Sequence, residues 1–153
     1  MGYKDVMAHE HVHKDFHGAL SFGLQFLLER YGPEEMEAYL CRVAEEVYRP
    51  LRERLKWEGL SALEEYWRKV FILEGCREGE DFVLSYEDGV LVLKVHRCPV
   101  IHHIRDRGYR LADRFCESTR IVNEGICRPV GYGCSVEYDQ KVGRCIQRFW
   151  RGG

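Results

Sequence analysis

The sequence lacks the features that mark several large classes of protein. No apolar run approaches the ~18 residues that a helix needs to cross a bilayer. The N-terminus lacks the basic-then-apolar order of a secretory signal, and no repeat, linker or low-complexity tract divides the chain. We therefore expect a soluble, cytoplasmic protein without a membrane partner. It should fold as a single domain over residues 1–153, with residues 1–9 as a flexible leader.

Paired cysteines and side-chain amides are also scarce. The seven cysteines are odd in number and include no Cys-x-x-Cys pair, which favours reduced thiols in a cytosolic protein over a disulfide framework. The chain has one Asn and three Gln beside plentiful Glu and Arg, a composition tilted toward thermophiles, although seven cysteines argue the other way.

The net charge of −2 hides an asymmetry between two parts of the chain. Residues 1–93 carry a net charge of −8 and residues 94–153 a net charge of +6, the latter mostly from arginine. This pattern is open to two interpretations: complementarity within the chain or at a self-association surface such as a homodimer, or binding of an anionic small molecule. No basic stripe interleaved with aromatics appears, so we expect no nucleic-acid partner.

Hydrophobic periodicity predicts an α+β fold. Apolar residues recur every three or four positions in the first half and then alternate in pairs of strands. The expected helices cover 10–31, a second from Pro33 to the break at Gly59 with a kink or division at Pro50, 61–75, a short segment from Pro99, and 109–122. The expected strands cover 81–87, 90–96, 134–138 and 144–150. We thus expect N-terminal helices packed on an antiparallel sheet made of two hairpins, with one or two helices between them.

All seven histidines fall in two short windows, residues 9–17 and 96–103. His13 and His17 are four residues apart, so on a helix they lie on one face. Their near-neutral pKa suits proton transfer or metal ligation. The alternative is that His17 is a hydrogen-bonded histidine of the core.

Cys98 is the more specific signal for a reaction centre. A predicted strand ends at His96, and Pro99 fits the first position of a helix, which places Cys98 at the N-cap. Backbone N–H groups there should lower the thiol pKa and make Cys98 a nucleophile, with His102 one helical turn away as acid or base. The alternative is a buried cysteine beside a surface His-His pair.

A metal centre is a further alternative. Two thiolates and two imidazoles make a chemically suitable zinc set, although these ligands are scattered through the sequence. The candidate ligands of zinc or another divalent metal are Cys98, Cys116, His13 and His17. Otherwise no cofactor is expected.

The junction Cys98-Pro99 and the segment from Gly143 to Phe149 resemble the L-2-amino-thiazoline-4-carboxylic acid hydrolase family over roughly residues 10 to 150. The layout is also similar to the small-molecule-binding domains named after vinyl reductase. One position departs from the hydrolase pattern, because Ile146 follows the late cysteine where that family usually has an acidic residue.

The resemblance implies a small hydrolase that opens a C–N bond of a cyclic amidine-like, carboxylated molecule. In that interpretation Cys98 or a metal-bound water attacks, and a histidine protonates the leaving atom. Arg105 or Arg144 would hold the carboxylate. Apart from the resemblance, Tyr109 is a candidate to line the pocket, although tyrosine is equally common at the edge of a core. The alternative is a non-catalytic small-molecule-binding or metal-binding sensor domain.

Overall fold

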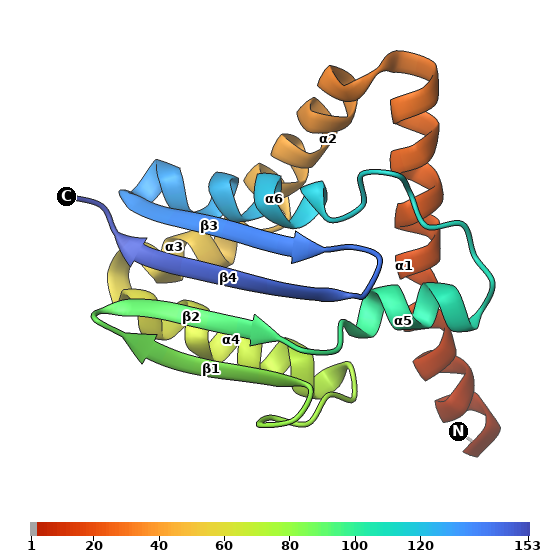
Figure 1. Ribbon diagram of the computed structural model, residues 1–153, viewed down its shortest axis with the longest axis horizontal. Helices are drawn as coiled ribbons and strands as arrows, with labels where there is room; N and C mark the ends of the chain where they lie inside the picture. The colour runs from red at the N-terminus through yellow and green to blue at the C-terminus, as the bar shows by residue number, and fades with distance from the viewer. Residues whose placement is uncertain (1–2) are drawn as a thin grey trace.

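The computed structural model describes residues 3–153, with side chains from Lys14 onward, and it has the predicted α+β architecture (Figure 1). The first half contains α1 (Tyr3–Tyr31), α2 (Pro33–Glu46), α3 (Arg49–Glu58) and α4 (Leu60–Leu73). The chain divides next to Pro50, as the sequence predicts. α1 begins at Tyr3, so residues 3–9 of the expected leader are helical, and residues 1–2 lie outside the described part.

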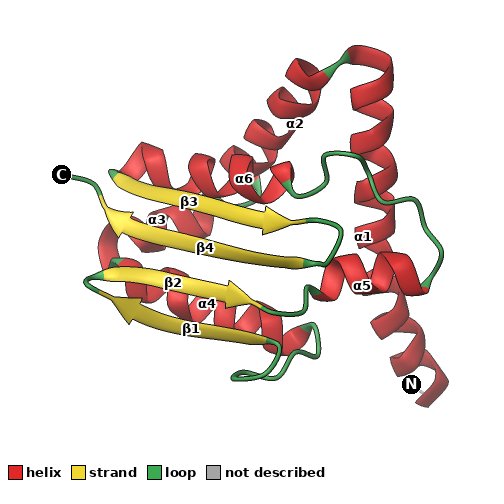
Figure 2. Cartoon of the chain, viewed as in Figure 1, coloured by secondary structure: helices red, strands yellow, loops and turns green. Residues whose placement is uncertain are grey.

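The second half supplies the sheet (Figure 2). Its elements are β1 (Phe82–Glu87), β2 (Val90–Val95), α5 (Pro99–Asp106), α6 (Glu117–Cys127), the short 3-10 helix Arg128–Val130, β3 (Tyr132–Asp139) and β4 (Arg144–Arg151). The two predicted hairpins pair through β2 and β4, so the strand order is β1-β2-β4-β3 with every neighbour antiparallel. Asp88, at φ 52°, and Gly89, at φ 79°, form the tight turn of the first hairpin.

One side of the sheet carries the core. Figure 1 shows α3, α4 and α6 behind the four strands, and α4 and α6 contact the sheet directly. Leu91 and Leu93 of β2 and Phe149 of β4 face these helices and are almost fully buried. The other side carries cross-strand ion pairs such as Lys94–Glu87 at 3.3 Å. The helix side of the sheet is therefore where a buried site can form.

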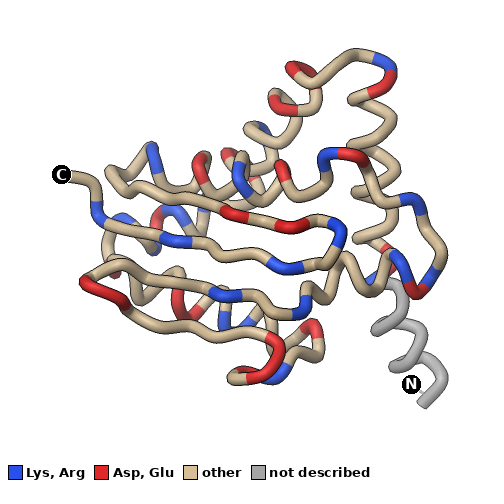
Figure 3. Tube along the Cα trace, in the orientation of Figure 1, with Lys and Arg blue, Asp and Glu red and all other residues tan. Residues whose placement is uncertain are grey.

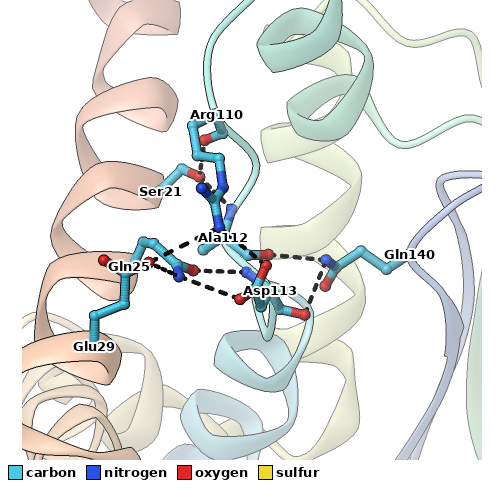
Figure 4. A network of polar contacts seen from close by, with 7 residues as sticks. All are labelled: Ser21, Gln25, Glu29, Arg110, Ala112, Asp113 and Gln140. Atoms are coloured by element: carbon cyan, nitrogen blue, oxygen red, sulfur yellow. Dashed lines mark hydrogen bonds and ion pairs between the residues drawn. The ribbon is translucent and has the colours of Figure 1, made fainter.

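The helix expected over residues 109–122 begins only at Glu117, so the prediction is wrong for residues 109–116. Side chains from other elements satisfy the backbone of this segment instead (Figure 4). Ser21 of α1 donates to the carbonyl of Arg110 at 2.6 Å and accepts from the N–H of Ala112 at 2.8 Å. Gln140, from the β3–β4 loop, donates to the carbonyl of Ala112 at 2.9 Å. These contacts compete with helical hydrogen bonds and hold the segment non-helical.

Charges of both signs are interspersed along the described chain (Figure 3). Ion pairs join the acidic and basic halves at three places, Arg107–Asp15, Arg110–Glu29 and Lys94–Glu87, which supports complementarity within the chain. Among the described helices, none combines the length and apolar character that crossing a membrane requires.

Candidate functional site

A cavity of about 310 Å³ lies between the helices and the helix side of the sheet. Residues of α1, α2, α4, α5 and α6 line it, together with β2, β3 and β4. Most of these side chains are apolar or aromatic, such as Val43, Phe71 and Val122. Cys98, Cys116, His17 and Arg144 also line it, so the fold brings four of the predicted site residues to one cavity.

Cys98 occupies the N-cap of α5, as the sequence predicts. Its N–H donates to the carbonyl of Gly143 at 2.8 Å, which ties the start of α5 to the β3–β4 loop. Burial raises the pKa of the Cys98 thiol, and donation from the N–H groups of Ile101 and Val100 offsets this only in part. The predicted lowering of this pKa is therefore wrong, because loss of water outweighs the helix N-terminus.

Two further thiols line the same cavity. Burial, with the charge of Cys98 as a lesser cause, raises the pKa of Cys116 to about 12 and that of Cys145 to about 11. Cys116 lies at the N-cap of α6 rather than within a helix. Sequence reasoning gave Cys145 no role, although it stands in the segment that carries the resemblance. All three thiols are thus protonated near neutral pH.

A histidine–carboxylate pair joins α1 to the end of α4 and lines the cavity. His17 Nε2 lies 3.0 Å from Glu74 Oε1, and only 8% of the Glu74 side chain is exposed. The hydrogen bond between the imidazole Nε2 and the carboxylate oxygen fixes the orientation of the ring. Sequence reasoning missed Glu74, since a glutamate at a helix end gives no local sign of burial.

A buried amide pair crosses from α6 to β4. Asn123 Nδ2 donates to Gln147 Oε1 at 2.8 Å, and both residues line the cavity while remaining almost fully buried. Nearby, Trp67 lines the cavity, and its Nε1 is the buried side-chain nitrogen without a hydrogen-bond partner among the described residues. The scarcity of amides in the sequence could have drawn attention to the Asn–Gln pair.

Of the other predicted catalytic histidines, His102 lies outside the cavity. His102 packs beside Gly143 of the β3–β4 loop and does not line the cavity. Burial lowers its pKa, and the charges of Arg97 and Arg105 lower it further. His13 lies in α1, but its side chain falls outside the described residues.

Two of the three predicted substrate-binding residues make structural contacts instead. Arg105 donates to the carbonyl of Gln140 at 3.0 Å, and the Tyr109 hydroxyl donates to Asp15 at 3.1 Å. Neither lines the cavity. Arg144 does, and it forms no ion pair with an acidic side chain of the described residues.

The predicted metal set is not assembled among the residues whose side chains are described. They contain no group of three or more His, Cys, Asp or Glu residues that could hold a metal ion. The fourth predicted ligand, His13, lies outside that part of the chain. A metal site therefore stays a prediction.

A wider hollow of about 750 Å³ lies between α2, α3 and residues 125–130. Its lining carries charges of both signs, including Glu45, Arg52, Glu53 and Lys56. None of the predicted site residues with a described side chain borders it. We therefore place the candidate site in the apolar cavity, which has the lining typical of small-molecule sites.

Comparison with protein-family models, with curated proteins and with solved structures found no match for this chain.

Proposed function

We propose that this protein is a small-molecule-binding domain whose ligand occupies the 310 Å³ cavity. The observation that carries the proposal is the lining: largely apolar side chains with a few polar groups, the composition that orients small ligands. The raised pKa of each cavity thiol supports binding over chemistry, since a protonated thiol is a weak nucleophile.

The polar groups of the lining suggest the class of ligand. Arg144 borders the cavity and is itself exposed, so we infer that its guanidinium meets an anionic group at the cavity mouth, for which a carboxylate is the natural geometric partner. The aromatic and aliphatic walls then take an apolar body. The ligand we propose is an apolar small molecule that carries one anionic group, held inside a cytoplasmic protein with seven free thiols.

Native mass spectrometry and a fluorescent probe test this proposal together. Protein spectra recorded before and after denaturation should differ by the mass of a retained ligand. Denatured and refolded protein should bind 8-anilinonaphthalene-1-sulfonate, an apolar anion, at one site per chain. Arg144→Gln should weaken the binding roughly tenfold, the size of a lost charge-assisted contact of about 1.4 kcal/mol.

Arg151→Gln is the matched control, since Arg151 ends the same strand, is exposed and does not line the cavity. Thr119→Phe, which places a ring in the cavity, should remove binding while circular dichroism stays unchanged. The proposal would be contradicted if the native spectrum showed only the mass of the chain and the refolded protein did not bind the probe.

A hydrolase is the second candidate function, favoured by the presence of the Cys98 thiol and the His17–Glu74 pair in one cavity. The substrate would be a cyclic amidine-like carboxylate of the kind that the resemblance implies. The Cys98 sulfur would attack the amidine carbon as His17 takes the thiol proton. The imidazolium would then protonate the leaving ring atom as its bond to the amidine carbon breaks. Water would add to that carbon with loss of a proton to His17, and the bond from the carbon to the Cys98 sulfur would break as His17 returns the proton and restores the thiol. Arg144 would hold the carboxylate.

Turnover and thiol reactivity separate the two candidates. A hydrolase should open L-2-amino-thiazoline-4-carboxylate, and both Cys98→Ala and His17→Gln should abolish that activity. Iodoacetamide should then modify Cys98 faster than the other six thiols near pH 7. Slow, uniform labelling with no turnover would leave the binding domain as the only function of the cavity.

Metal binding modifies either candidate. If His13 joins His17, Cys98 and Cys116, elemental analysis of untagged protein should find about one zinc per chain. A content far below this would remove the metal from both candidates.

A further inference from the structure

The outer face of α1 exposes aromatic rings to solvent. Figure 1 shows α1 at the edge of the molecule, with α2 and α5 packed on its inner side. Phe16 is 67% exposed, Phe22 is 53% exposed and Phe26 is 54% exposed. Single exposed apolar residues are ordinary, but three rings along one helix form a patch that marks an interaction surface.

A glycine within this patch supports the same inference. Glycine inside a helix costs roughly 0.5–1 kcal/mol relative to alanine, so it needs a packing reason. Gly18 has a packing reason, because a Cβ there would lie 2.6 Å from the Tyr109 ring. Gly125 has one too, because a Cβ there would lie 2.5 Å from Ala44 Cβ. Gly23 has none within the described chain: a Cβ there would meet no heavy atom within 4 Å. Contact with another chain would explain its small size.

The order of residues on this face is symmetric. Along the helix, a large residue is followed by two small ones and another large one, at spacings of three, four and three positions. These four exposed residues are Phe16, Ala19, Gly23 and Phe26. A twofold axis near position 21 would place Ala19 against Gly23 of a second copy and Phe16 against Phe26. We propose that α1 pairs with α1 of a second copy of this chain, antiparallel, through this face, which we call the α1 face.

The charge and the area of the α1 face are compatible with a second copy of the chain as its partner. The exposed residues of α1 from Phe16 to Phe26 are all uncharged, so two identical faces meet without repulsion. A phenylalanine side chain offers ~150–250 Å². With Tyr31, which is 58% exposed, the face can bury roughly 1,000 Å² over two copies, the lower limit of a specific interface. The dimer should therefore be weak and dependent on concentration.

Sedimentation velocity on the full chain from about 1 to 500 μM tests the proposal. The wild type should shift from the 18.1 kDa monomer toward twice that mass as concentration rises. Phe16→Glu with Phe26→Glu should weaken association at least about tenfold, since it places four carboxylates in the interface. Trp57→Glu is the matched control, because Trp57 is 78% exposed on α3 and should leave association unchanged.

Gly23→Leu separates loss of the interface from loss of the fold. The side chain enters open space in the monomer, so its melting temperature should not fall, while close approach of two helices is blocked. A wild type that stays monomeric up to 500 μM would overturn the proposal, and so would a Gly23→Leu variant that associates like the wild type. If the full chain bound phosphatidylcholine–phosphatidylglycerol vesicles but did not dimerise, the proposal would also be overturned, in favour of a lipid partner for α1.

Discussion

α1 buries two polar side chains on its inner face and exposes aromatic rings on its outer face. The inner face buries Ser21 and Gln25, which are 0% and 6% exposed, beside Leu24. The outer face exposes Phe16 and Phe26 to solvent. Like most surface helices, α1 also packs an apolar stripe against the core: Leu20, Leu24, Leu27 and Leu28. The buried polar pair and the exposed rings are what distinguish α1 from an ordinary amphipathic helix.

Each face has its own physical explanation. The inner polar side chains replace the hydrogen bonds that residues 110–113 would make in a helix, so their burial is compensated. The outer aromatic side chains stay largely in solvent, and we propose a second copy as the partner. The predictions that follow test this difference.

The largest effect should come from removing the inner polar contacts. Ser21→Ala with Gln25→Leu leaves the N–H groups of Ala112 and Asp113 without their acceptors. We expect the free energy of unfolding to fall by about 2–5 kcal/mol, as measured by urea denaturation. A loss under about 0.5 kcal/mol would show that this network does not hold the segment.

Adding one methyl group to the inner face should lower the free energy of unfolding by less than removing the polar contacts does. In Gly18→Ala the new Cβ would lie 2.6 Å from the ring of Tyr109, so helix and ring must move apart. We expect a loss of about 1–3 kcal/mol in unfolding free energy, the usual cost of overpacking. An unchanged urea midpoint would mean that the Tyr109 ring moves aside freely.

Adding the same methyl group to the outer face should raise the free energy of unfolding instead of lowering it. Gly23→Ala meets open space and removes the conformational cost of glycine, so the monomer should gain about 0.5–1 kcal/mol. The measurement is urea denaturation at about 1 μM, where the proposed dimer is dissociated. Equal losses at Gly18 and Gly23 would abolish the distinction between the two faces.

The smallest effect concerns pH at the α1–α5 contact. The hydrogen bond from His103, 3.2 Å away, together with those from Tyr109 and the charge of Arg107, lowers the pKa of Asp15 despite some desolvation. A lowered folded-state pKa means that this stabilisation is present above the ordinary aspartate pKa and is lost as pH falls through the folded value. Between about pH 5 and 3, wild type should therefore lose slightly more stability than Asp15→Asn. Parallel profiles for the two proteins would contradict this role of Asp15.

Local sequence signals predicted most of the elements. Asp88-Gly89 predicted the first hairpin and Pro99 the start of α5, because turn and helix-cap geometry depend on nearest neighbours. The helix expected from residue 109 failed for the opposite reason. Gln25 and Gln140, both distant in sequence, provide the hydrogen bonds that hold residues 112–116 outside a helix.

The candidate site, like the fold, was predicted only in part from the sequence. The sequence predicted Cys98 as an N-cap, but its raised pKa depends on burial by segments far along the chain. Glu74 and Cys145 entered the site only when α4 and β4 were brought to the same cavity. The predicted acid–base role of His102 is not supported by its position, since it packs against the β3–β4 loop outside the cavity.

The sequence by itself determined the α+β class, the two hairpins and the N-cap position of Cys98, because each depends on periodicity or on adjacent residues. Only the tertiary structure decided which side chains share the cavity, the direction of the thiol pKa shifts and the exposure of the α1 face. Those properties arise from burial and long-range contact, which depend on how the whole chain packs rather than on any one segment.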